Sequence, residues 1–141
     1  MTESLFIGKA AESYVWTRLL EHSYVPYVPL LDVKGVDLVV ETPEGGFCKL
    51  QVKSRGFPLP EKGSYGEEIK DLWWTEGEVA FDCLVIVLPK NDSQGHEAWV
   101  VPALEVKEHL SSKGGDLTLS RRLLLQEWKQ FHENWRLTTE A

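Results

Sequence analysis

Two neighbouring stretches of the sequence combine an acid, an amide and a lysine in a pattern that suits metal-assisted phosphate chemistry. The first is residues 35–41, with Asp37 near its start, and the second is residues 49–55, with Gln51 and Lys53. Both are rich in branched apolar residues, which predicts strands, and the glycines between them predict a hairpin turn. Alternate residues of a strand share a face, so Gln51 and Lys53 are expected side by side, next to Asp37. Such a layout suits a divalent metal held beside a phosphate.

A further acid, Glu12, belongs to the element that precedes this hairpin. Residues 4–23 carry apolar side chains at helical spacing, and Ser4 is a candidate N-cap for the predicted helix. Taken alone, a glutamate such as Glu12 at the edge of an apolar stripe is more often simply solvated. Asp37 and Lys53 taken alone would more often form a plain cross-strand ion pair. Together with the amide, the set favours a site.

The rest of the chain indicates a mixed central sheet flanked by helices, an α/β (α+β) fold. We predict a single domain over residues 1–141, in which residues 119–141 form an additional C-terminal helix. The remaining predicted elements are a short edge strand within residues 24–31, a long loop over 56–66, a short helix over 67–74, a central strand over 81–88 covered on both faces, a strand over 98–101, a helix over 104–111, and a last helix capped by Ser120 that runs to about Trp135.

Composition limits the class of protein. The 141 residues carry a formal net charge of −7, which argues against a protein whose whole surface binds polyanions, although a local basic cleft is compatible with it. Cys48 and Cys83 lie within predicted strands without metal-ligand spacing, and the four histidines show no zinc spacing. We expect reduced core cysteines and a cytoplasmic protein. The first residues do not resemble a signal peptide, and no apolar run is long enough for a membrane span.

The chain carries three motifs in this order: Gly8-Lys9-Ala10-Ala11-Glu12, Gly35-Val36-Asp37 and Gln51-Val52-Lys53. Together they resemble the PD-(D/E)XK nuclease superfamily. The last of them is similar to the Q-x-K variant of a group I intron homing endonuclease, and the set also resembles archaeal Holliday-junction resolvases. The likeness extends to about His109 and implies a restriction-endonuclease-like fold. Val36 departs from the proline that is common before the acid, and Gln51 replaces the acid of the majority pattern.

The resemblance implies a metal-dependent endonuclease that hydrolyses DNA with Mg²⁺ or Mn²⁺. It makes Glu12, Asp37 and Gln51 metal ligands together with the carbonyl of Val52, and it assigns the attacking water to Lys53. Glu12, Asp37, Gln51 and Lys53 would thus be the catalytic residues. Candidates for phosphate contact are Lys9, Ser54 and Arg55.

A second function class remains open, a catalytically inactive nuclease-fold domain that binds a protein or a nucleic acid. The acidic balance favours this alternative, whereas the intact set of polar residues favours the enzyme. For the enzyme we expect a homodimer. The two candidate contact surfaces are an aromatic loop (Phe57, Tyr65, Trp73, Trp74) and the last helix (Trp128, Phe131, Trp135).

Overall fold

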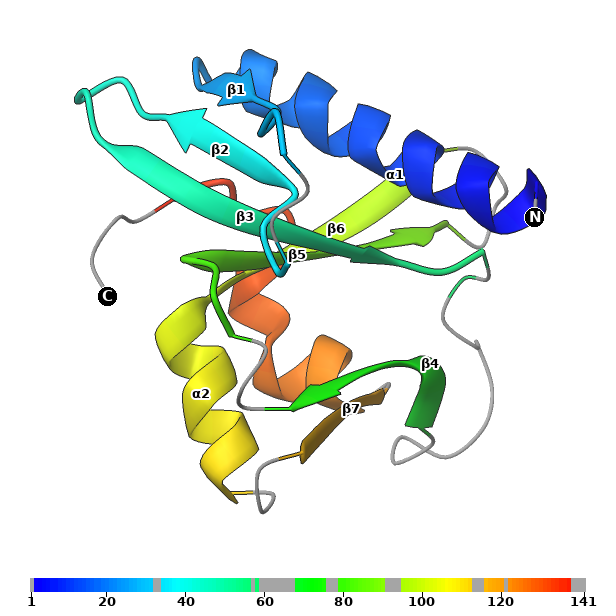
Figure 1. Cartoon of the computed structure of the whole chain (residues 1–141). Coiled ribbons are helices and arrows are strands. Elements are labelled where there is room, and N and C mark those ends of the chain that lie inside the picture. Colours follow the sequence, from blue (N-terminus) through cyan, green and yellow to red (C-terminus); the bar gives the residue numbers. More distant parts are fainter. Residues whose placement is uncertain are drawn as a thin grey trace.

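The structure, a computed structural model, contains one five-stranded sheet with helices on both faces (Figure 1). Helix α1 (Thr2–Glu21) crosses one face, and α2 (Ala103–Ser112) lies on the other together with the C-terminal helical turns. This arrangement confirms the predicted mixed sheet flanked by helices. The residues that the structure describes are 2–31, 34–56, 58, 68–75, 79–90, 95–112, 116–120 and 122–137.

The sheet has the order β1-β2-β3-β5-β6 and mixes both kinds of pairing. The strands are β1 (Val25–Tyr27), β2 (Leu38–Glu41), β3 (Phe47–Ser54), β5 (Cys83–Pro89) and β6 (His96–Pro102). Strands β2 and β3 form the predicted antiparallel hairpin, which turns at Gly45 with a φ of 91°. A residue with a side chain would be strained in that conformation, so the glycine has a clear role here. Strand β3 then pairs in parallel with β5, which pairs antiparallel with β6.

Strand β5 is the covered central strand that its apolar run predicts. Val85 and Val87 belong to the core under α1, whereas Leu84 and Ile86 belong to the core under α2. A strand buried on both faces needs apolar residues at every position, which explains why its sequence does not alternate. Strand β1 lies at the edge of the sheet, as predicted for a strand that contains a proline.

Helix α1 is held on the sheet by three side chains spaced four residues apart. Ala11, Val15 and Leu19 are almost completely buried in the same core as Leu50 of β3. Positions i, i+4 and i+8 lie on one side of a helix, so this stripe fixes which side faces the strands. Burial of each larger aliphatic side chain stabilises the fold by about 2 kcal/mol.

The helix predicted over residues 67–74 is wrong because long-range pairing overrides the local pattern. Residues 67–74 do not form a helix, since β4 (Glu68–Thr75) is a strand that pairs antiparallel with β7 (Asp116–Ser120) in a separate two-stranded sheet. The partner strand lies more than forty residues away in sequence, so local periodicity could not indicate it. Ser4 is not an N-cap, because α1 already begins at Thr2.

The last segment is not the continuous helix predicted to reach Trp135. It consists of a π-helical segment (Leu123–Glu127) and a 3-10 turn (Lys129–Phe131), after which the chain becomes extended. The wider π turn, closed by the 2.7 Å bond from Trp128 N–H to the Leu123 carbonyl, accompanies the complete burial of Trp128. The predicted cap is present in part, because the Ser120 hydroxyl accepts the Leu123 N–H at 3.2 Å.

The predicted dimer contact through this last segment is wrong for its two tryptophans. Trp128 and Trp135 are buried within the chain, so neither is offered to a partner. The alternative aromatic loop falls outside the described residues at positions 57 and 65, and the side chains of positions 73 and 74 are outside them as well. Within the described part of the chain, no helix is both long and apolar enough to cross a membrane.

Candidate active site

Asp37 lies directly before β2, where the β2–β3 ladder ends and β3 runs on. The last ladder pair is Leu38 with Leu50, and β3 runs on to Ser54. Asp37 N–H donates to the Leu50 carbonyl at 2.7 Å, and its carboxylate Oδ2 accepts the Val52 N–H at 2.7 Å. The carboxylate therefore takes the place of a strand partner and is fixed at this edge of β3.

Glu12 and Lys9 lie beside Asp37. The three residues line one hollow of about 320 Å³ between α1 and the start of β2. Lys9 Nζ is 3.3 Å from a Glu12 carboxylate oxygen, an ion pair one helical turn long. Glu12 follows the buried Ala11 directly, so it projects from the border of the stripe that packs on the sheet. The structure thus brings together two acids and a lysine that are 28 residues or fewer apart in sequence.

Gln51 and Lys53 do not line this hollow. In β3, Leu50 and Val52 pack on the α1 side, so the alternate residues Gln51 and Lys53 leave the strand on the opposite face. They flank Val52, whose N–H binds the Asp37 carboxylate. Both residues therefore belong to the same short stretch of β3 as the Asp37 contact, but their side chains leave the strand on the other face of the sheet.

Ser54 and Arg55 lie apart from the acids. They line a second hollow of about 240 Å³, together with residues of the first turns of α1 and with His96. A Cβ at Gly56 would come within 2.7 Å of the Ile7 side chain, so the chain leaves β3 very close to α1 here. The proposed phosphate contacts of Ser54 and Arg55 stay a prediction.

The donor set suits a hard cation better than a soft one. Carboxylate oxygens of Asp37 and Glu12 are the ligands that Mg²⁺ and Mn²⁺ prefer. Within the described residues, no group of three or more His, Cys, Asp or Glu side chains is arranged to hold a metal. The Sγ atoms of Cys48 and Cys83 lie 3.9 Å apart in the core and are not joined in a disulfide, so the two buried side chains pack against each other. The predicted reduced core cysteines are confirmed.

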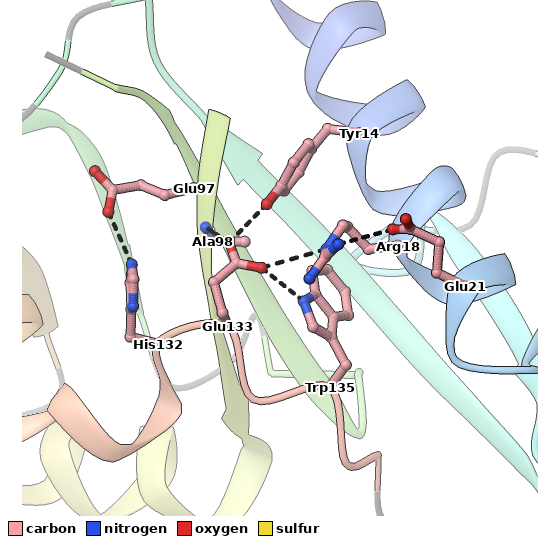
Figure 2. A network of polar contacts seen from close by, with 8 residues as sticks. All are labelled: Tyr14, Arg18, Glu21, Glu97, Ala98, His132, Glu133 and Trp135. Atoms are coloured by element: carbon pink, nitrogen blue, oxygen red, sulfur yellow. Dashed lines mark hydrogen bonds and ion pairs between the residues drawn. The ribbon is translucent and has the colours of Figure 1, made fainter. Parts of the chain in front are cut away.

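A carboxylate that sequence reasoning missed, Glu133, joins the C-terminal segment to α1 and β6 (Figure 2). Its Oε2 accepts hydrogen bonds from the Tyr14 hydroxyl and the Ala98 N–H, both at 2.7 Å. Its Oε1 accepts from Trp135 Nε1 at 2.9 Å and lies 3.4 Å from Arg18 Nε. Glu133 also donates its own N–H to the Ala98 carbonyl at 2.8 Å. No sequence pattern marked this residue, because its partners on α1 are more than one hundred positions away.

The environment of Glu133 stabilises its ionised form. Burial alone would raise the pKa of this carboxyl, but hydrogen bonds from Trp135, Tyr14 and the Ala98 N–H, together with Arg18, lower the pKa overall. The same contact acts in the opposite sense on Tyr14, because burial and the hydrogen bond to Glu133 raise the pKa of the phenol. Since Tyr14 and Arg18 belong to α1, the helix that carries Glu12 is fixed to β6 by an ionised carboxylate.

Comparisons with known proteins support the fold. No family model matches the sequence, and no curated protein matches it either. Among solved structures, the chain is similar to a bacterial homing endonuclease, I-Ssp6803I, with a TM-score of 0.57 and 21% sequence identity. The chain has a nuclease-like fold. The match covers 96% of this chain and 91% of that one, so the nuclease-like fold includes the C-terminal segment and not only residues up to about 109.

Proposed function

We propose that the protein is a metal-dependent endonuclease that hydrolyses phosphodiester bonds of DNA, of the Q-x-K type in the PD-(D/E)XK superfamily. The observation that carries this proposal is the Asp37 carboxylate, held on the Val52 N–H at the open edge of β3 and sharing a hollow with Glu12. Support also comes from the likeness of the whole chain to a homing endonuclease.

In this proposal the acids Asp37 and Glu12 hold Mg²⁺ or Mn²⁺ in the hollow that they share, with the Val52 carbonyl as a neutral ligand. Gln51 leaves β3 on the opposite face of the sheet, so its amide is left out of this ligand set. Bound there, the ion would neutralise charge on the scissile phosphate and lower the pKa of a water. Oδ2 of Asp37 accepts the Val52 N–H, so the carboxylate keeps one orientation before any ligand arrives. Lys53 leaves β3 on the opposite face, so its long side chain would have to reach around the edge of the strand to orient the attacking water and stabilise developing negative charge. Lys9, at the mouth of the hollow, would contact the phosphate.

The test uses two variants and a control that changes the same chemical group at another residue bound to a β3 amide. Asp37→Asn keeps the shape and the bond to Val52 N–H but removes the anionic ligand, so Mn²⁺ affinity and cleavage should both fall. Asp82→Asn is the control, because Asp82 Oδ2 likewise accepts a β3 amide, that of Lys49 at 2.8 Å. Lys53→Ala should keep metal binding and lower the cleavage rate about a hundredfold.

The measurements are calorimetric Mn²⁺ binding, cleavage of labelled DNA in several forms, and melting temperature. Loss of metal affinity in Asp37→Asn with normal affinity in Asp82→Asn supports the site. Equal metal binding in both variants, combined with lower melting temperatures in Asp37→Asn and Lys53→Ala, would show that the residues only stabilise the fold.

A catalytically inactive binding domain is the second candidate. The observations that favour it are the net charge of −7 and the Lys9–Glu12 ion pair, which neutralises one of the two acids. Under this alternative the wild-type protein binds DNA or a protein without any metal requirement and cleaves no DNA form in either Mg²⁺ or Mn²⁺.

A further inference from the structure

The hollow that contains the two acids also has an aromatic wall. Trp16 follows Glu12 by one helical turn, so both side chains leave α1 on the same side. About a third of the Trp16 side chain remains accessible, whereas Trp99, Trp128 and Trp135 are almost completely buried. Trp16 is therefore the described tryptophan that is positioned to contact a ligand beside the acids.

The remaining lining of the hollow fits a flat heterocycle with polar edges. Val28 adds a second apolar contact, and Ser13 and Thr17 add hydroxyl groups that can donate or accept hydrogen bonds. A hollow of about 320 Å³ has room for one nucleobase but not for a base pair within a stacked duplex. The single helical turn between Glu12 and Trp16 also matches the short reach from a phosphate to the base of the same nucleotide.

We propose that this hollow binds the base of an unpaired nucleotide by stacking on Trp16, so that the substrate is DNA with single-stranded or locally unpaired nucleotides at the scissile phosphate. The inference rests on the proposed function for the position of that phosphate. A base inside a continuous duplex is covered by its neighbours, and only a base that has left the stack reaches such a wall.

The charge of the chain agrees with this substrate class. Affinity for duplex DNA comes mainly from lysine and arginine side chains that neutralise phosphates. In this chain acidic side chains outnumber lysine and arginine, which gives the net charge of −7. Stacking of bases on aromatic side chains supplies affinity that does not depend on positive charge and tolerates any base sequence. Lys9, whose side chain is 72% exposed, is placed for the one phosphate that must enter the hollow.

The experiment measures binding without cleavage and then cleavage separately. Fluorescence anisotropy in EDTA compares wild type, Trp16→Ala, Trp16→Phe and Leu20→Ala against a labelled ten-nucleotide oligothymidylate, the same backbone without bases, and a duplex of equal length. Leu20 is the control because it lies one turn further along α1, is exposed, and does not line the hollow. Circular dichroism establishes that each variant is folded.

We expect wild type to bind oligothymidylate more tightly than the abasic chain or the duplex. Trp16→Ala should lose about tenfold in affinity for oligothymidylate only, Trp16→Phe should recover part of it, and Leu20→Ala should match wild type. The inference would be overturned if wild type and Trp16→Ala bound oligothymidylate with equal affinity. It would also be overturned if wild type bound the abasic chain as tightly as oligothymidylate.

Two further outcomes distinguish this inference from a protein-contact role of Trp16 and from a failure of the proposed endonuclease function. If Trp16→Ala changes the oligomeric state by light scattering and leaves oligothymidylate binding intact, Trp16 contacts a protein and the inference is overturned. A failure of the proposed function has a different signature, because wild type then cleaves neither duplex, flap nor bubble DNA in Mg²⁺, whereas the anisotropy results still decide whether the base stacks on Trp16.

Discussion

Replacement of Glu133 by glutamine should destabilise the fold far more than the loss of one surface charge. Both carboxylate oxygens act as acceptors, Oε2 for Tyr14 and Ala98 and Oε1 for Trp135. An amide keeps only one acceptor oxygen. If the amide nitrogen takes the place of Oε1, the Trp135 N–H loses its acceptor. If the nitrogen takes the place of Oε2, the Ala98 N–H loses its acceptor. In either orientation at least one partly buried N–H is left unpaired, and the attraction to Arg18 is lost.

An unpaired buried donor costs about 1–3 kcal/mol, and a hydrogen bond to a charged group contributes about 1.5–3 kcal/mol. We therefore expect Glu133→Gln to lower the free energy of unfolding by about 3 kcal/mol, which corresponds to a melting temperature about 10 °C lower. A domain of this size keeps enough stability to remain folded. Urea unfolding followed by tryptophan fluorescence measures the change, and an unaltered m-value shows that the transition is still comparable.

Glu97→Gln is the matched control, because it removes the same charge from a neighbouring position. Glu97 contacts His132 at 2.8 Å, but the His132 side chain is 43% exposed, so this loss should cost at most about 1 kcal/mol. The pH dependence gives a second check. The lowered pKa of Glu133 stabilises the fold above the ordinary carboxyl pKa of 4.5, and this contribution disappears as the pH falls through the folded-state value.

The difference between wild type and Glu133→Gln should therefore be constant near neutral pH and shrink below about pH 4.5. Equal losses in Glu133→Gln and Glu97→Gln, or a difference that persists unchanged into acid, would refute the role assigned to Glu133. A double-mutant cycle with Tyr14→Phe should give a coupling of about 1 kcal/mol, since the two groups share one hydrogen bond.

Other predictions follow from the core and the site. Trp135→Ala should cost about 3–5 kcal/mol, measured by urea unfolding, because the side chain is buried in the core under α1; a loss below 1 kcal/mol would contradict that burial. The pKa of Cys48 is raised by its contact with Cys83 and by burial, so neither thiol should react with Ellman's reagent until the protein unfolds. Rapid labelling of native protein would contradict this. Raising the pH past 10, the ordinary pKa of tyrosine, should destabilise wild type more than Tyr14→Phe in thermal melts, because the folded state favours the neutral phenol. Equal losses would contradict it.

Local sequence patterns correctly predicted the features that depend on residues within a single helix, strand or turn. The continuous apolar run of β5 indicated burial on both faces, and Gly45 indicated the hairpin turn. The spacing of Ala11, Val15 and Leu19 showed which side of α1 faces the sheet. Each signal depends on the period of a helix or a strand, or on the conformational freedom of glycine, and these act within a few residues.

The structure brings only part of the predicted site together, because Asp37 and Glu12 share a hollow whereas Gln51 and Lys53 do not line it. The sequence pointed to Asp37 beside the side chains of Gln51 and Lys53, whereas the Asp37 carboxylate contacts the backbone N–H of Val52. The difference arises because the register stops at Leu38 and leaves that N–H without a strand partner. Where a ladder ends depends on the paired strands together, and neither strand alone encodes it.

The sequence by itself determined the mixed sheet, the side of α1 that packs on it, and the polar residues available for chemistry. Only the tertiary structure decided that β4 pairs with β7, that the last segment breaks after residue 131, and that Glu133 binds Tyr14. These features depend on hydrogen bonds between residues far apart in the chain. These hydrogen bonds stabilise the fold only once the intervening elements have packed, so the secondary-structure propensity of a local segment does not indicate them.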